Sequence, residues 1–230
     1  MEQAAPDTRR FWIQVTAADD ATAPAFAHRA GQFITLDLPI STKRLQRWRS
    51  YSIASAPNGS NEFELCIVRL EGGAGSTYLF EEVAVGSTLR FKGADGNFVL
   101  PDTLDTPLVM VCTGTGIAPF RAMLHDIFAQ EKPHQSLHLI FGTRYATGIL
   151  YRTELEALQA AHPELSYSIA LSREQTAQTT YGYVHSIYAQ HTDPQAHYYL
   201  CGWKNMIDEA VMHLRKAGIP DTQIHYEVYG

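Results

Sequence analysis

The spacing of apolar residues changes near residue 101, and this change constrains the fold more than any other feature of the sequence. Before it, short strand-like runs are separated by turn signals such as Pro57-Asn58-Gly59, and no long helical stripe occurs before residue 75. After it, strand-like apolar runs alternate with stripes of helical period. The sequence therefore predicts two domains: an antiparallel β-barrel over residues 1–101, then an α/β domain with a parallel sheet over residues 102–230.

The individual elements are expected where these patterns recur. In the first domain, strands are expected at residues 11–16, 32–38, 49–54, 62–70 and 88–91. After a linker at residues 101–107, strands are expected at residues 108–112, 137–141, 165–171, 198–201 and 223–229. Helices are expected between these strands: one begins near Ile117, one spans residues 151–161, and the last ends before Gly218 and Pro220.

Composition excludes several classes of function. The chain has 230 residues and a formal net charge of −6, which argues against non-specific binding of nucleic acid. No apolar stretch is long enough to span a membrane, and residues 1–10 lack the apolar core of a signal peptide, so we expect a cytoplasmic protein. An iron–sulfur cluster needs four thiolates, or two thiolates and two histidines, whereas the three cysteines, Cys66, Cys112 and Cys201, are far apart and form no Cys-x-x-Cys, so no cluster is expected. The ten histidines stand singly, and no metal site is expected.

The run Arg49-Ser50-Tyr51-Ser52 places three kinds of side chain close together on one expected strand. The arginine is a planar fork of donors that suits a diphosphate, the tyrosine ring can lie on a flat ligand, and Ser52 offers a small hydroxyl. Downstream, the glycine-rich segment Gly73-Ala74-Gly75-Ser76-Thr77 allows backbone amides to converge on an anion. Ser76 is expected to cap the helix that follows.

A second set of motifs follows the strands of the expected parallel sheet. The run from Gly114 to Arg121 comes after a buried strand and opens a helix, the context of a dinucleotide diphosphate at a switch point. Arg144 follows the next strand, and Ser172-Arg173 follows the one after. Ligands bind at such strand ends in open sheets, so the two arginines are candidates for a phosphate.

In this order, these motifs resemble the ferredoxin–NADP reductase family, and the resemblance continues through Cys201-Gly202 and the tail Glu227-Val228-Tyr229. It covers nearly the whole chain and implies an FAD-binding barrel followed by a nicotinamide-binding domain. It also implies electron transfer between NADPH and a one-electron carrier, by hydride transfer between nicotinamide C4 and flavin N5.

The resemblance assigns roles to individual residues. Arg49 would contact the flavin diphosphate and Tyr51 the isoalloxazine or ribityl chain, while Ser52 would lie near N5. Cys201 would lie beside nicotinamide C4, Glu227 would order it, and Tyr229 would cover the flavin face. The remaining cofactor-binding candidates are Ser50, Cys66, Ile67, Val68, Gly75, Ser76 and Thr77 for FAD, and Gly114, Thr115, Gly116, Arg144, Ser172, Arg173 and Gly202 for the nicotinamide nucleotide.

Cofactor choice and partner follow from charged residues. Arg144 and Arg173 together favour the 2′-phosphate of NADPH over NADH. The basic cluster, defined as Lys43, Arg44, Arg47 and Arg49, is either a solvated loop or a surface on which an acidic ferredoxin or flavodoxin docks. A monomer is expected. Three alternatives stay open: a reductase of free flavin, the reductase component of a multi-chain oxygenase, and a non-catalytic flavoprotein subunit.

Overall fold

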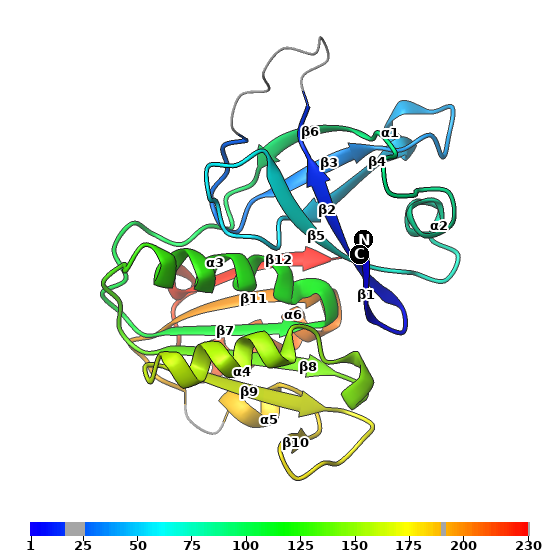
Figure 1. The fold of residues 1–230 in the computed structure, drawn as a ribbon. Coiled ribbons are helices and arrows are strands. Elements are labelled where there is room, and N and C mark those ends of the chain that lie inside the picture. Colours follow the sequence, from blue (N-terminus) through cyan, green and yellow to red (C-terminus); the bar gives the residue numbers. More distant parts are fainter. Residues whose placement is uncertain (17–25, 190–191, 230) are drawn as a thin grey trace.

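The computed structural model describes residues 1–16, 26–189 and 192–229 (Figure 1). Two three-stranded antiparallel sheets make up the first part of the chain, in the orders β1-β2-β5 and β4-β3-β6. Ile53, just after β4, bridges Leu65 in β5 and so connects the two sheets. The strands are β1 (Glu2–Ala5), β2 (Thr8–Gln14), β3 (Phe33–Asp37), β4 (Trp48–Ser52), β5 (Glu62–Val68) and β6 (Arg90–Asp95).

These strands confirm the expected antiparallel domain and add one strand to it. β1 lies before the first expected strand and forms a tight hairpin with β2, because Ala5 pairs directly with Thr8. Between the two sheets lies an apolar core in which Leu36, Phe63 and Leu79 are fully or almost fully buried. Two short helices complete this part: α1 (Arg44–Arg47) and α2 (Ala74–Glu81).

The second part is a six-stranded sheet in the order β10-β9-β8-β7-β11-β12, and every neighbouring pair in it is parallel. The expected parallel sheet is therefore confirmed. β10 was not expected, because its two residues are exposed and carry no apolar run. The strands are β7 (Leu108–Thr113), β8 (Leu137–Thr143), β9 (Leu165–Leu171), β10 (Thr180–Tyr181), β11 (His197–Trp203) and β12 (Ile224–Tyr229).

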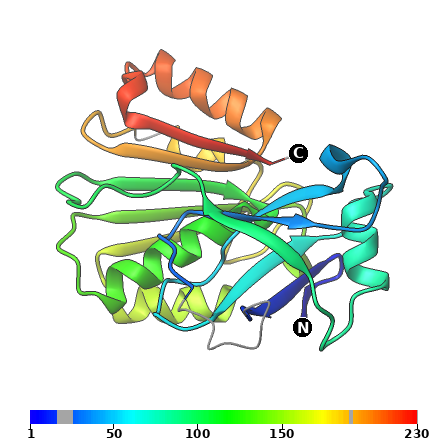
Figure 2. The ribbon, with the colours of Figure 1, turned by 90° about the horizontal axis from the view of Figure 1, so that it is seen from above.

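Helices cover both faces of this sheet, as the view from above shows (Figure 2). Met110 and Cys112 of β7 belong to the core under α3 (Ile117–Ala129) and α4 (Arg152–Ala161). The intervening Val111 faces the core under α5 (His185–Tyr188) and α6 (Lys204–Lys216). Because successive strand side chains point to opposite faces, a strand covered on both sides reads as the continuous apolar run seen in the sequence. In the part of the chain that the structure describes, three 3₁₀ turns join these elements: η1 (Gly114–Gly116), η2 (Ala146–Gly148) and η3 (Asp221–Gln223).

The direction in which the chain adds strands to this sheet reverses once. From β7 the chain builds outward through β8, β9 and β10, then returns to the other side of β7 to form β11 and β12. The crevice outside the carboxyl ends of β7 and β11 is thus a topological switch point, where open α/β sheets bind ligands. β12, red in Figure 1, runs toward the first part of the chain. Among the described residues, no helix is long and apolar enough to cross a membrane.

Candidate functional site

The loop η1 lies directly against the end of β11 at the switch point. A Cβ placed on Gly116 would lie 2.4 Å from the carbonyl oxygen of Cys201, so only glycine allows this approach. Around Gly114, in contrast, a Cβ would meet nothing within 4 Å. The loop therefore packs tightly on its inner side and leaves open space on its outer side, and α3 begins there with no side-chain cap on its amides. This arrangement fits a dinucleotide phosphate.

One hydrogen bond joins the first part of the chain to the sheet at this crevice. The Ser52 hydroxyl at the end of β4 donates to Oε1 of Glu227 in β12 over 2.8 Å. Glu227 pairs in register with Cys201 on the neighbouring strand. Burial raises the pKa of Glu227, and the bond from Ser52 partly offsets that rise. The structure thus brings together three of the four expected catalytic residues.

The fourth, Tyr229, completes this cluster. Its hydroxyl is buried beside Cys201 and Ser52, yet it forms no hydrogen bond of standard geometry with any described residue. The Oγ1 of Thr113, at the end of β7, is buried in the same unsatisfied state. Cys201 itself is fully buried, and burial raises the pKa of its thiol, so the sulfur stays protonated and neutral. Two unsatisfied hydroxyls around a neutral thiol fit a ligand with polar groups of its own.

A second cradle lies on the first part of the chain, at the N-terminus of α2. A Cβ on Gly75 would lie 2.8 Å from Cγ of Arg49, so the arginine side chain passes directly over the first turn. This helix also starts without a side-chain cap. The expectation that Ser76 caps it is wrong: Ser76 lies within the first turn, and its hydroxyl bonds the backbone of Leu70 and Gly73 instead. Uncapped amides beside a guanidinium fit a diphosphate such as that of FAD.

The other flavin-binding candidates lie on β4, β5 and α2. Tyr51 is half-buried on β4, and burial raises the pKa of its phenol to about 12. Ser50 is exposed and its hydroxyl lies 3.0 Å from Oγ1 of Thr35. Cys66 and Ile67 point into apolar cores, whereas Val68 is half-buried. Thr77 continues the first turn of α2, where its amide donates to the carbonyl of Gly73.

The two expected phosphate-binding arginines lie together. The amide of Arg173, after β9, donates to the carbonyl of Arg144, after β8, over 3.0 Å, and both side chains are exposed. The amide of Ser172 pairs in the same way with Thr143. Glu174 holds the adjacent turn by accepting from the amide of Ala146 over 2.7 Å. Two strand-end arginines in this register can reach one phosphate.

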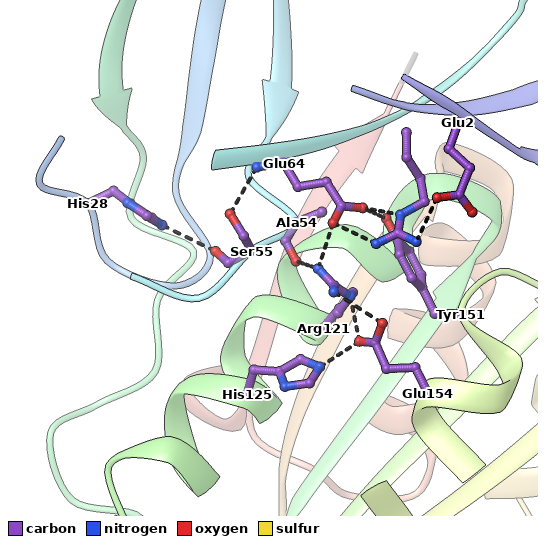
Figure 3. A network of polar contacts seen from close by, with 10 residues as sticks. Glu2, His28, Ala54, Ser55, Glu64, Arg121, His125, Tyr151 and Glu154 are labelled. Atoms are coloured by element: carbon purple, nitrogen blue, oxygen red, sulfur yellow. Dashed lines mark hydrogen bonds and ion pairs between the residues drawn. The ribbon is translucent and has the colours of Figure 1, made fainter. Parts of the chain in front are cut away.

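A buried ion network close to the site was not predicted (Figure 3). Its centre is Glu64 of β5, which is 3% exposed and accepts bonds from Arg10, Arg121 and Tyr151. Arg121 was visible only as the end of the glycine motif. A charged residue between apolar neighbours, as in Phe63-Glu64-Leu65, is the one sequence signal that could have identified it.

Comparisons with known proteins agree with this geometry. The model of the oxidoreductase FAD-binding domain matches residues 1–100, and that of the oxidoreductase NAD-binding domain matches residues 110–212. Ferredoxin--NADP reductase B of Sorangium cellulosum is 36% identical over 230 residues, which cover 95% of this chain and 92% of that protein. The toluate 1,2-dioxygenase electron transfer component of Pseudomonas putida is 31% identical over 91% of this chain. The chain spans 61% of the length of that second relative.

Solved structures show the same fold. A cytochrome P450 reductase from Amycolatopsis matches with a TM-score of 0.86 and 26% identity, over 98% of this chain and 66% of that one. A ferredoxin NADP+ reductase from Neisseria gonorrhoeae, solved with FAD and NADP, matches with a TM-score of 0.78 and 24% identity, over 97% of this chain and 93% of that one.

Proposed function

The chain belongs to the ferredoxin–NADP reductase family of flavin oxidoreductases, with FAD and NADPH as cofactors, and from that premise we propose that it passes electrons between NADPH and a one-electron carrier such as ferredoxin or flavodoxin. One observation carries this proposal. The Ser52–Glu227 bond of 2.8 Å brings the end of the flavin motif onto the strand beside Cys201, where the nicotinamide motif also converges.

The cofactors, when bound, supply the redox chemistry, in which hydride moves between nicotinamide C4 and flavin N5 and single electrons move to the carrier. The protein's own groups would position the cofactors and shield the reacting atoms. Arg49 and the amides of α2 would hold the FAD diphosphate, and the η1 loop would hold the nicotinamide nucleotide. Ser52 and Glu227 fix the two motifs relative to each other. Cys201, which is buried and neutral, would form a small wall beside the reacting atoms.

Cofactor preference gives the first test. We expect the protein to purify yellow, and NADPH to bleach its flavin faster than NADH under anaerobic conditions. Arg173→Ala should raise KM for NADPH roughly 10- to 100-fold, the loss expected for one charge-assisted hydrogen bond, and leave KM for NADH nearly unchanged. Absorbance spectra and stopped-flow traces measure both effects. Arg152→Ala, which removes a guanidinium bonded to Glu156 and Gln178, is the matched control.

The same measurements separate the alternatives. Protein that purifies colourless and binds added FAD weakly would instead be a reductase of free flavin. Equal efficiency with NADH and NADPH would contradict the preference and favour the reductase component of an oxygenase, which the relative from Pseudomonas putida supports. A yellow protein that neither nucleotide bleaches would be a non-catalytic flavoprotein subunit.

Docking of an acidic carrier gives the second test. Lys43 and Arg44 are exposed at the start of α1, which leads directly into the flavin strand β4. We expect Lys43→Glu/Arg44→Glu to lower kcat/KM for ferredoxin and to leave reduction of ferricyanide, a small acceptor, unchanged, because charges at the edge of an interface act mainly on association. The defect should fade as salt rises. The control with the same change of charge is Arg215→Glu/Lys216→Glu at the far end of α6. Equal ferredoxin kinetics in both double variants would make the basic cluster a solvated loop.

A further inference from the structure

The network around Glu64 connects both parts of the chain through one carboxylate (Figure 3). Oε1 of Glu64 accepts from Nε of Arg10 at 2.6 Å and from the Tyr151 hydroxyl at 2.7 Å. Its Oε2 accepts from Nη2 of Arg10 at 2.9 Å and from Nη1 of Arg121 at 3.2 Å. Arg10 lies on β2 and Glu64 on the neighbouring strand β5, where Glu64 pairs in register with Trp12, whereas Arg121 and Tyr151 come from the α/β part. The carboxylate thus accepts bonds from both sides of the junction.

Arg121 makes the complementary connection. Its Nη1 also donates to the carbonyl of Ala54 at 2.7 Å, and its Nε and Nη2 hold the two carboxylate oxygens of Glu154 at 2.6 and 3.1 Å. Its guanidinium stacks over the Tyr151 ring, 4.6 Å from the centroid. One rigid planar group therefore contacts β5, the segment after β4, and α4 at the same time.

These contacts lie close in sequence to the residues that handle the two cofactors. Ala54 comes two residues after Ser52, in the segment that continues the flavin motif. Arg121 lies on α3, the helix that begins at the η1 loop. The guanidinium of Arg121 is consequently a short mechanical link between the flavin motif and the nicotinamide motif.

We propose that the Glu64–Arg121 ion pair is a positioning element that sets the angle between the flavin-binding and nicotinamide-binding parts, and thereby the alignment for hydride transfer. The proposal rests on the proposed function. Neither residue belongs to the cofactor cradles described above, so both act through Ser52 and the η1 loop.

Directional bonds are what makes this pair suited to the task. Apolar side chains at the same junction, such as those of Ala54 and Phe120, can slide over one another at little cost because the hydrophobic effect has no preferred direction. A guanidinium that donates to three residues, one of them a carboxylate that is 3% exposed, can form all of these bonds only in one arrangement. At the centre of the network two cations, Arg10 and Arg121, pair with two anions, Glu64 and Glu154. At its edges Glu2 lies 3.7 Å from Arg10, and His125 contacts Glu154.

The test uses isosteric neutral variants. Glu64→Gln keeps the shape of the side chain but removes the charge that holds Arg121, and Glu154→Gln does the same at the more exposed end. We expect the single-turnover rate of flavin reduction by NADPH to fall roughly 10- to 100-fold in Glu64→Gln, as misalignment near 1 Å would cause, and several-fold in Glu154→Gln. The affinities for FAD and NADPH should stay near wild type. Glu156→Gln, on the same helix but paired with Arg152 at the surface, is the matched control.

A second readout needs no turnover. The three native cysteines are buried, so spin labels can be attached selectively to Val85→Cys and Met212→Cys, which are exposed positions, one on each part. Pulsed electron paramagnetic resonance then measures the distance between the two labels. We expect a single narrow distribution in the parent, and a broader or displaced one with Glu64→Gln but not with Glu156→Gln.

Each outcome either supports or contradicts the positioning role of the Glu64–Arg121 pair. Unchanged rate and unchanged distance distribution in both Glu64→Gln and Glu154→Gln would overturn the proposal, as would equal losses in Glu156→Gln. If Glu64→Gln does not fold, Glu154→Gln carries the test. A wild type that NADPH does not reduce would refute the proposed function alone, since the distance measurement would still test the positioning role.

Discussion

Ser52→Ala is expected to slow flavin reduction by NADPH roughly 100-fold, the cost of about 1 Å of misplacement between reacting groups. Ser52 donates a direct hydrogen bond from the end of the flavin motif to Glu227, on the strand that pairs with that of Cys201. Without its hydroxyl, the half-buried Glu227 loses the bond that Ser52 donates to its carboxylate. The variant should bind NADPH nearly as tightly as wild type, because alignment is expressed in the transition state rather than in ground-state binding.

A double-mutant cycle shows whether the two residues act as a unit. Glu227→Gln alone should give a loss similar to that of Ser52→Ala, and the double variant should be little worse than either single one. Stopped-flow absorbance of the flavin measures all four proteins. Ser87→Ala, which removes an exposed hydroxyl bonded to the amide of Ala84, is the control. Fully multiplicative losses would mean that Ser52 and Glu227 contribute independently, and the bond between them would then have no catalytic role.

The Ser52–Glu227 bond also predicts how the rate of flavin reduction depends on pH. Because burial raises the pKa of Glu227, its carboxylate takes up a proton at a higher pH than an ordinary glutamate. Protonation weakens the acceptor for the Ser52 hydroxyl, so the reduction rate of wild type should fall as pH falls through this raised pKa. Glu227→Gln has no carboxylate to protonate, so its reduction rate should show no such fall in this pH range.

The long helices and strands could be located from the sequence, because a buried face leaves a regular pattern of apolar residues. The expected strand at residues 165–171 coincides with β9, and the expected helix at residues 151–161 differs from α4 by one residue. Both carry enough apolar side chains to mark a face or a run. β1, β10 and α5 span four residues or fewer and carry too few apolar residues to mark a period, so tertiary contacts determine them.

For a related reason, only part of the candidate site could be predicted from the sequence. Glycines and arginines at strand ends are local signals, and they identified the η1 loop and the pair Arg144 and Arg173. The contact between Ser52 and Glu227 joins residues 175 positions apart, so only the resemblance to a family anticipated that they lie close together. Glu64 and Arg121 were not identified, because a charge in a sequence looks the same whether it is solvated or buried in a network.

Arg121→Ala is expected to lower the free energy of unfolding by about 3 kcal/mol, the low end of the range for breaking a buried pair. Arg121 is 12% exposed in its side chain, and its removal leaves Glu154 without its bidentate partner and Glu64 without one of its two cations. Arg152→Ala breaks the surface pair with Glu156 and should cost less than about 1 kcal/mol. Urea unfolding at neutral pH measures both, and equal costs would place the Arg121 pair among ordinary surface contacts.

Acid should erase part of the difference in stability between wild type and Arg121→Ala, and the sign follows from Glu154. Burial by itself would raise its pKa, but bonds from His125 and Arg121 outweigh burial and lower the pKa from 4.5 to about 2. Between these values the unfolded chain binds more protons than the folded one, so stability is present above 4.5 and is lost as pH falls toward 2. Glu154 is partly exposed, so solvent screening limits this contribution to about 1 kcal/mol. The gap between wild type and Arg121→Ala should therefore narrow below pH 4.5, whereas a gap independent of pH would show that Arg121 stabilises the protein without Glu154.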